Sequence, residues 1–248
     1  MNLILPFGPA LALLLTSNLP APTPPTLTPA TTYLTPQPAA RGPWQRLFDK
    51  KTLIGWHTFQ KPGQPIPANW EVADGAIHYT GTRGGGDIVT DNAYGNFELE
   101  LEWKIAVGGN SGIMYHVSED TIYKATYETG PEMQVLDDAR HPDANAGREG
   151  SHKAGSLYDM LPPNGLAAVK PAGQWNKVRL RVLNGQAEHF MNGKEIVAYP
   201  TSGPSWDAMV AKSKFKNWAG FGKFTTGKIA LQDHGDQVWY RNIRIREL

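Results

Sequence analysis

Asn96-Phe-Glu-Leu-Glu-Leu-Glu-Trp-Lys-Ile105 decides the fold class of this chain. Apolar residues occupy every second position from Phe97 to Ile105, and Glu or Lys fills the positions between them. Side chains of a β-strand point alternately to opposite faces, so this stretch predicts a strand with one buried and one charged face. Glu132-Met-Gln-Val-Leu-Asp137 alternates in the same way, and we expect the two stretches to pair. Both would then present carboxylates and amides on the solvent side of one sheet.

The chain from Trp44 onward contains more strand signals than helix signals. Two dipeptides, Asp74-Gly75 and Asn192-Gly193, suit two-residue hairpin turns between alternating segments. Only residues 205–216 space their apolar side chains as a helix does, with Ser205 as the candidate N-cap. Many short strands and one short helix predict an all-β fold, a jelly-roll β-sandwich of two antiparallel sheets.

The first 43 residues differ in composition from the rest of the chain. Residues 3–15 form an apolar run that is too short to span a bilayer and resembles the core of a secretory signal, although no basic residue precedes it. Residues 20–43 are dominated by Pro, Thr and Ala, which cannot bury enough apolar surface to fold. We therefore expect a signal peptide at 1–19, a linker at 20–43 and one folded domain at 44–248. The protein would be exported to the periplasm or outside the cell, with no transmembrane anchor.

Composition excludes several classes of function. The formal net charge is +1 and the basic residues are scattered, so nucleic acid is not an expected partner. The chain has no cysteine, which excludes disulfides, thiolate catalysis and cysteine-based zinc sites. No Gly-x-Gly-x-x-Gly opens a helix after a strand, so no dinucleotide site is expected.

Eight motifs follow one another along the folded part of the chain. They are Leu47-Phe-Asp49 with Leu53-Ile-Gly-Trp56, Trp70-Glu-Val-Ala-Asp-Gly75, Tyr94-Gly-Asn-Phe97 with Leu101-Glu-Trp-Lys104, Asn110-Ser-Gly-Ile113, Glu132-Met-Gln-Val-Leu-Asp137, Gly155-Ser-Leu-Tyr158, Gly173-Gln-Trp-Asn176, and Gly227-Lys-Ile-Ala-Leu-Gln-Asp-His-Gly235 with Val238-Trp-Tyr-Arg-Asn-Ile243. This series resembles the 3-keto-disaccharide hydrolase domain family over residues 44–248. The resemblance implies a concanavalin A-like jelly roll that is usually exported and acts on oxidised glycosides. The same fold also hosts lectins and ordinary glucanases, so the fold alone does not decide the chemistry.

The expected chemistry is the cleavage of a 3-keto glycoside by elimination. The C3 ketone acidifies the C2 proton, so a base removes it, the C1 aglycone leaves, and water then adds to the unsaturated ketone. This route needs a base near C2, a donor to the C3 oxygen and an acid for the leaving group. As a hypothesis, Glu132 or His234 is the base, and Lys104 or Gln134 polarises the ketone.

Further residues are expected to hold the substrate. Asp137 and Tyr158 would act on the leaving group or position the sugar. The expected substrate-binding residues are Glu102, Asn110, Gln134, Tyr158, Gln232 and Trp175. Other residues fit structural roles. Glu98 and Glu100 suit cross-strand pairs, and four tryptophans suit the core, namely Trp56, Trp70, Trp103 and Trp239. By contrast, Trp175 and Trp218 are free to stack on a sugar.

No cofactor is predicted. His141 and His152 lie in a polar, Gly-rich loop and match no standard metal-ligand spacing, and a divalent metal stays open. The expected partners are an oxidised carbohydrate substrate and a separate sugar oxidoreductase that makes the ketone. Two alternatives remain open: a carbohydrate-binding module without catalysis, and an ordinary two-carboxylate glucanase. The glucanase alternative is weakened by Gln134, because an amide stands two residues after Glu132, where the second carboxylate of such an enzyme would be expected.

Overall fold

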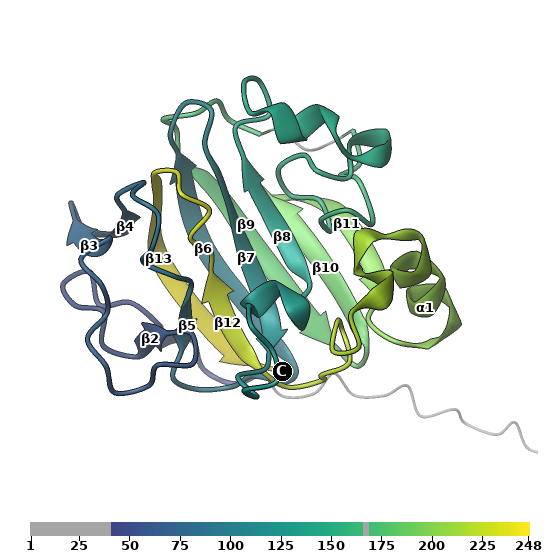
Figure 1. Cartoon of the computed structure of the whole chain (residues 1–248), viewed down its shortest axis with the longest axis horizontal. Coiled ribbons are helices and arrows are strands. Elements are labelled where there is room, and N and C mark those ends of the chain that lie inside the picture. The colour runs from purple at the N-terminus through teal and green to yellow at the C-terminus, as the bar shows by residue number, and fades with distance from the viewer. Residues whose placement is uncertain (1–40, 166–168) are drawn as a thin grey trace, which may run out of the picture. The chain divides into compact units, whose positions relative to one another are not determined.

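The computed structural model describes residues 41–165 and 169–248. They form two stacked antiparallel β-sheets, with one α-helix and four 3-10 turns among these residues (Figure 1). The predicted all-β jelly-roll sandwich with one short helix is confirmed. The expected signal peptide, residues 1–19, and nearly all of the expected linker, residues 20–43, lie outside the described residues. No described helix is long and apolar enough to cross a membrane.

The larger sheet has eight strands. Seven follow the order β11-β10-β9-β6-β13-β4-β3, and β1 pairs with β13. Their bounds are β1 Gln45–Arg46, β3 Trp70–Ala73, β4 Ala76–Tyr79, β6 Phe97–Ile105, β9 Asn176–Leu183, β10 Gln186–Met191, β11 Lys194–Pro200 and β13 Val238–Glu247.

The smaller sheet has five strands in the order β2-β5-β12-β7-β8. Their bounds are β2 Trp56–Thr58, β5 Ile88–Thr90, β7 Asn110–Val117, β8 Glu132–Leu136 and β12 Lys228–Leu231. The helical segments are η1 Thr126–Glu128, η2 Pro142–Asn145, η3 Arg148–Gly150, α1 Gly203–Lys212 and η4 Lys214–Asn217. In Figure 1 this sheet lies in front of the larger one.

The hydrophobic core lies between the two sheets. On β6, the alternate residues from Phe97 to Ile105 are buried, as the sequence pattern predicts. On the facing sheet, β7 and β8 contribute Ile113, Tyr115 and Met133 to the same core cluster. Each fully buried side chain of this size stabilises the fold by about 1.5–3 kcal/mol, so the apolar faces of the strands hold the sandwich together.

Both predicted hairpin turns are present. Asp74 and Gly75 join β3 to β4 with φ angles of 50° and 70°. Asn192 and Gly193 join β10 to β11 with φ angles of 49° and 87°. Positive φ at both central residues matches the right-handed twist of the flanking strands, and Asn, Asp and Gly tolerate it best.

The expected pairing of Glu132–Asp137 with Asn96–Ile105 is wrong. β8 pairs with β7, whereas β6 lies in the other sheet between β9 and β13. Alternation indicates which face of a strand is buried but does not identify its neighbour. The expected N-cap is also wrong, because Ser202 precedes α1 and Ser205 lies inside it.

The charged face of β6 forms the outer surface of the larger sheet. Glu98, Glu100 and Glu102 accept hydrogen bonds from arginines on the neighbouring strands, for example Arg244 Nη2 to Glu100 Oε2 at 2.6 Å and Arg241 Nη2 to Glu102 Oε2 at 2.7 Å. The cross-strand pairs expected for Glu98 and Glu100 are therefore confirmed.

Trp239 also lies on this outer face, and its expected place in the core is wrong. Its ring stacks on His78 with 4.5 Å between ring centroids, and Lys104 Nζ lies 4.2 Å from its centroid. Because Trp239 pairs in register with Lys104 and His78, its side chain shares their face.

Candidate functional site

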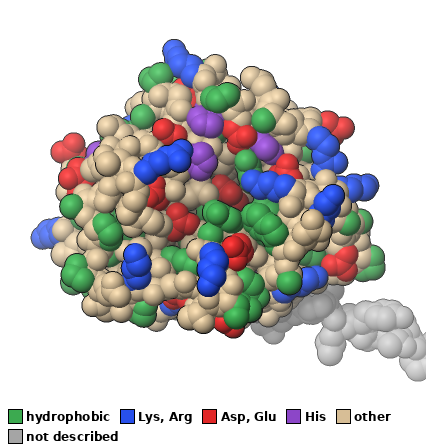
Figure 2. Space-filling view, in the orientation of Figure 1, with side chains coloured by type: hydrophobic (Ala, Val, Ile, Leu, Met, Phe, Trp, Pro, Cys, Tyr) green, Lys and Arg blue, Asp and Glu red, His purple; other side chains and the backbone are tan. Residues whose placement is uncertain are grey.

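A pocket opens on the outer face of the five-stranded sheet, over β7, β8 and β12. Its volume is about 290 Å³. It is lined by Asn110, Tyr127, Glu132, Gln134, Tyr158, Lys214, Phe215, Trp218, Gln232 and His234. Figure 2 shows this face of the molecule as a hollow, with histidine side chains gathered at its upper edge.

Glu132 lies on the floor of the pocket. Its residue is only 6% exposed, and its carboxyl group lies over Gly112 of the neighbouring strand. Burial raises the pKa of Glu132 to about 8, the negative charges of Asp87 and Asp143 add to this shift, and the positive charge of Lys214 opposes it. A carboxyl group with a pKa near neutrality can both accept and return a proton.

Three amide side chains surround Glu132. Gln134 follows it on the same face of β8, Asn110 starts β7, and Gln232 follows β12. Asn110 Oδ1 and Gln232 Oε1 are buried and have no hydrogen-bond partner among the described residues. Buried polar atoms are nearly always hydrogen-bonded, so these two oxygens indicate a place for a ligand that donates hydrogen bonds.

A hydrogen-bonded chain built around His152 connects two residues that line the pocket, Tyr158 and Lys214. His152 Nδ1 lies 2.8 Å from Asp143 Oδ1 and its Nε2 lies 2.9 Å from Asp159 Oδ1. The Tyr158 hydroxyl donates to Asp143 Oδ2 at 3.0 Å, and the Lys214 backbone N–H donates to Asp159 Oδ2 at 2.6 Å. This chain fixes the two pocket residues Tyr158 and Lys214 relative to each other.

Lys214 and Tyr158 bring charge and polarity to the pocket. Lys214 Nζ lies 4.1 Å from the centroid of the Tyr158 ring. Burial raises the pKa of the Tyr158 hydroxyl, and the nearby carboxylates of Asp143 and Glu132 add to that shift. The hydroxyl therefore stays protonated and serves as a hydrogen-bond donor.

The pocket also has an aromatic lining. The Trp218 ring lies 5.4 Å from the ring of Tyr127 and 5.2 Å from that of Phe215, measured between centroids. Tyr127 is 42% exposed, so its ring is accessible from solvent. Aromatic faces beside buried amides are typical of sites that bind sugars, because a sugar ring has apolar C–H faces and polar edges.

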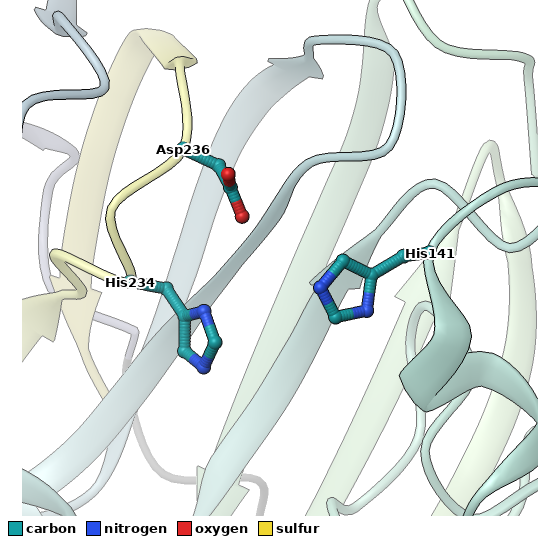
Figure 3. Close-up of side chains that lie close together, drawn as sticks. All are labelled: His141, His234 and Asp236. Atoms are coloured by element: carbon teal, nitrogen blue, oxygen red, sulfur yellow. The ribbon is translucent and has the colours of Figure 1, made fainter.

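His234, which lines the pocket, lies close to two further side chains, His141 and Asp236. His141 precedes η2, and His234 and Asp236 lie in the loop between β12 and β13. Figure 3 shows His234 and Asp236 on one side and His141 facing them on the other. One ligating atom from each lies within 4.8 Å of the other two. The His234 ring keeps an exposed edge, yet the protein atoms around it disfavour the charged form and lower its pKa.

Comparison with known proteins assigns the family. Residues 43–246 match the model of the 3-keto-alpha-glucoside-1,2-lyase-like domain. A 3-keto-disaccharide hydrolase of Bacteroides thetaiotaomicron is 37% identical over 228 residues, which are 82% of this chain and 77% of that protein. This chain belongs to the 3-keto-alpha-glucoside-1,2-lyase-like domain family. The resemblance read from the eight motifs is thereby confirmed.

Two solved structures of Parabacteroides distasonis proteins resemble this family member. For both of them, glycosyl hydrolase activity is itself only proposed. The first is 36% identical with a TM-score of 0.73, covering 84% of this chain and 94% of that one. The second is 28% identical with a TM-score of 0.63, covering 83% of this chain and all of the other. The sandwich is therefore shared within the family.

The structure brings six of the sequence-predicted site residues together in this family's pocket. These are Asn110, Glu132, Gln134, Tyr158, Gln232 and His234. They come from separate strands and loops, and the order of the motifs along the chain does not show that these residues lie close together in space. The sequence predicts that Glu132 and Gln134 lie on a solvent-exposed face of β8. In the structure this face is the pocket floor, and both residues are buried.

Four predicted residues lie elsewhere. Lys104, Glu102 and Trp175 are on the outer face of the larger sheet, where Trp175 packs against Lys104 and Arg241. Asp137 is buried at the end of β8 but holds the backbone, because it accepts from the Gly108 N–H at 2.8 Å and the Ala139 N–H at 3.2 Å. Their expected contact with a shared substrate does not fit this arrangement.

Three pocket residues carry no signal in the strand motifs: Tyr127, Lys214 and Phe215. Lys214 and Phe215 follow α1, and Tyr127 lies in η1, far along the chain from the strand motifs. No spacing rule connects them with Glu132. The sequence feature that could have pointed to Lys214 and Phe215 is the short run of aromatic and basic residues at 214–218, which is more polar than a helix buried in the core.

Proposed function

We propose that this protein cleaves the glycosidic bond of 3-keto glycosides by elimination followed by hydration. The carboxyl group of Glu132 removes the C2 proton, and the electron pair of that C–H bond forms an enolate with the C3 ketone. The C1–O bond then breaks, and the aglycone leaves as an alcohol after protonation. Water adds to C1 and a proton adds to C2, which gives a free 3-keto sugar.

The observation that carries this proposal is the number of carboxyl groups in the pocket. Among the described residues that line it, Glu132 is the only carboxylic acid. Hydrolysis of an unoxidised glycoside generally uses two carboxyl groups that flank the scissile bond. Elimination needs a single base at C2, because the ketone already stabilises the negative charge that develops.

Glu132 suits the proton transfer at C2. Its pKa of about 8 makes its carboxylate a stronger base than an ordinary glutamate. Once its proton has exchanged with solvent, the same group can deliver a proton to C2 after water has added to C1. One buried carboxyl group thus serves both half-reactions.

The remaining pocket residues supply charge stabilisation and binding. The Lys214 ammonium is the donor for the enolate oxygen or the departing oxygen. The Tyr158 hydroxyl donates to Asp143, so its oxygen can accept a hydrogen bond from a sugar hydroxyl. The unpartnered oxygens of Asn110 and Gln232 would accept hydrogen bonds from sugar hydroxyls. Trp218 offers its ring to the apolar face of a sugar.

The proposed reaction depends on a second enzyme and takes place outside the cytoplasm. A separate sugar oxidoreductase would install the C3 ketone, since the sequence contains no dinucleotide-binding motif. The substrate would be met outside the cytoplasm, as the apolar run at residues 3–15 suggests.

The test is turnover in heavy water. The full chain is incubated in D₂O with 4-nitrophenyl 3-keto-glucoside and, separately, with unoxidised 4-nitrophenyl glucoside. We expect release of nitrophenol from the keto substrate alone, and one deuterium at C2 of the 3-keto sugar product. Deuterium enters there because the C2 proton exchanges with solvent during elimination and hydration.

Two outcomes would overturn the proposal. Cleavage of both glucosides without deuterium at C2 would indicate an ordinary glycosidase. Binding of either sugar without turnover would indicate a carbohydrate-binding module.

A further inference from the structure

We propose that the leaving group of the substrate binds in a second pocket, the side pocket, which adjoins the Glu132 pocket at Tyr127. The side pocket has a volume of about 420 Å³ and is bounded by residues 58–61, 86–87 and 124–127. Thr58, Gln60 and Tyr127 would select a leaving group that has both hydroxyl groups and an apolar face, as a sugar ring does. The inference rests on the proposed function, because only a cleavage reaction has a leaving group.

The Glu132 pocket by itself is small for a substrate that extends beyond one sugar ring. Its volume of about 290 Å³ lies at the lower limit of the range of about 300–1,000 Å³ that is typical of small-molecule sites. Tyr127 lines this pocket and also the side pocket. A glycoside whose C2 faces Glu132 can therefore continue past the Tyr127 ring, so that the substituent on C1 enters the side pocket.

Thr58 provides a second observation that points to a ligand. It lines the side pocket and is 3% exposed, and its Oγ1 is buried without a hydrogen-bond partner among the described residues. Buried polar atoms are nearly always hydrogen-bonded, so this hydroxyl indicates a place for a hydroxyl group of the leaving group. Gly86 leaves room beside it, because a Cβ at position 86 would lie 3.3 Å from Thr58 Cγ2.

Gln60 is fixed in an uncommon conformation at the edge of the side pocket. Its φ of 57° lies in the left-handed region, which few residues other than glycine adopt. Its backbone N–H donates to Glu119 Oε1 at 2.7 Å, and its Nε2 donates to the backbone oxygens of Asp120 and Tyr123 at 3.0 and 2.8 Å. Both amide hydrogens are thus used, and Oε1 is the side-chain atom that Gln60 can offer to a ligand. Strained residues held in this way cluster at ligand-binding sites.

A network of charged side chains supports Gln60 through Glu119. Glu119 Oε2 lies 3.0 Å from His57 Nε2 and 3.4 Å from Lys228 Nζ. His57 Nδ1 in turn lies 2.6 Å from Asp91 Oδ1. None of these four residues is among the described residues that line the Glu132 pocket. Their connection with the proposed reaction is therefore the support that they give to the wall of the side pocket.

Asp87 lies in the wall of the side pocket and has a structural role. Its Oδ1 accepts a hydrogen bond from the Asp233 backbone N–H at 2.8 Å, and its Oδ2 accepts one from the Thr126 hydroxyl. Both oxygens are thus engaged in joining η1 to the loop that follows β12. The side pocket therefore supplies a binding surface and no second catalytic carboxylate.

The test compares two leaving groups on the same oxidised sugar. 3-Keto-maltose, oxidised in its non-reducing ring, releases glucose, whereas methyl 3-keto-α-glucoside releases methanol, which is too small to fill the side pocket. In Thr58→Val we expect KM for 3-keto-maltose to rise about tenfold through the loss of one hydrogen bond, with KM for the methyl glucoside unchanged. Thr121→Val is the matched control, because Thr121 is exposed and lies outside the side pocket.

A second variant fills the side pocket. Ala125 lines it, so the indole of Ala125→Trp would occupy the space of the leaving group. KM for 3-keto-maltose should rise by at least about tenfold, again without a change for the methyl glucoside. Ile122→Trp adds the same ring at a position that is 68% exposed and outside the side pocket, and it should affect neither substrate. If both substrates respond alike to Thr58→Val and to Ala125→Trp, the side pocket does not hold the leaving group.

Calorimetry distinguishes failure of this inference from failure of the proposed function. Binding of 3-keto-maltose is measured for Glu132→Gln protein that also carries either Ala125→Trp or Ile122→Trp. Weaker binding with Ala125→Trp alone, together with no turnover of any keto glycoside by the native protein, would keep the side pocket as a sugar subsite and remove the function. Equal affinities in the two proteins, or no binding in either, together with turnover by the native protein, would remove the side pocket and leave the elimination chemistry.

Discussion

The carboxyl group of Glu132 occupies the space that a Cβ atom at Gly112 would take on the neighbouring strand. An ideal Cβ at position 112 would overlap Oε1 of Glu132 and lie only 2.7 Å from its Cδ. Glycine is therefore required here by the close approach of a side chain and not by backbone conformation, since its φ is not positive. Glu132 can take its position on the pocket floor only because residue 112 has no side chain.

Gly112→Ala should displace the Glu132 carboxyl group and lower kcat/KM for a 3-keto glycoside by about 100-fold, the effect expected of a displacement of about 1 Å. Steady-state kinetics of the folded variant checks this. Gly165→Ala is the control, because a Cβ at Gly165 meets no atom within 4 Å. Equal activity of the two variants would show that the position of Glu132 is not critical.

Glu132→Gln should abolish turnover of the keto glycoside while leaving sugar binding nearly intact. The amide keeps the shape of the side chain but cannot accept the C2 proton. In the native protein, kcat/KM should rise with pH and reach half of its maximum near pH 8, where Glu132 becomes ionised. A pH-independent rate, or activity retained in the variant, would remove Glu132 from the base role.

Stability gives a second readout of the same substitution. The pKa of Glu132 is raised from 4.5 to about 8 on folding, so the folded protein binds more protons than the unfolded chain between these pH values. Its stability should therefore fall as the pH rises through that window. Glu132→Gln removes this loss and should be more stable than the native protein at pH 9, by up to about 4 kcal/mol. Urea unfolding at pH 5 and pH 9 measures the difference.

His152→Ala should destabilise the fold and raise KM. The substitution leaves Asp143 and Asp159 without their shared donor, at an expected cost of about 2–4 kcal/mol, and frees the Tyr158 hydroxyl from its fixed position. Thermal unfolding and kinetics check both effects. His78→Ala loses one hydrogen bond to the half-exposed Glu71 and the stacking contact with Trp239, and should cost about 1–2 kcal/mol, less than His152→Ala. Similar effects of the two changes would contradict a special role for His152.

Trp218→Ala should raise KM for the keto glycoside by about tenfold, corresponding to about 1.4 kcal/mol of lost stacking, with little change in kcat. Trp175→Ala is the matched control. Its ring lies 3.9 Å from the Arg241 guanidinium on the opposite sheet, so its loss should leave KM unchanged. If KM rose for Trp175→Ala and not for Trp218→Ala, the sugar would bind on the outer face of the larger sheet instead.

The ion pairs on the outer face of the larger sheet should be lost in acid. Burial alone would raise the pKa of Glu102, but hydrogen bonds from Arg241 and Asn242 outweigh it and hold the pKa below its ordinary value of 4.5. A carboxylate with a lowered folded pKa stabilises the protein above its unfolded pKa, and this contribution disappears as the pH falls through the folded pKa. Glu102→Gln should therefore reduce the loss of stability below pH 4.5 while leaving kcat/KM unchanged. Urea unfolding across that pH range and kinetics at neutral pH measure these two effects.

The sequence by itself determined the local structure of this protein. Alternation from Phe97 to Ile105 predicted the buried face of β6, and Asp74-Gly75 and Asn192-Gly193 predicted two turns, because strand period and positive φ are properties of neighbouring residues. The order of motifs also indicated the family, and with it Glu132, Gln134 and Asn110 as residues of interest.

Only the tertiary structure decided which of these residues meet. Glu102 and Glu132 both sit on outward faces of strands, yet they belong to different sheets, because strand pairing depends on the whole chain and leaves no trace in the alternation of one strand. Lys214 joined the pocket through the packing of η4, and His141 came close to His234 and Asp236. Distances between residues a hundred positions apart are set by how two sheets and their loops pack together, and no local pattern records them.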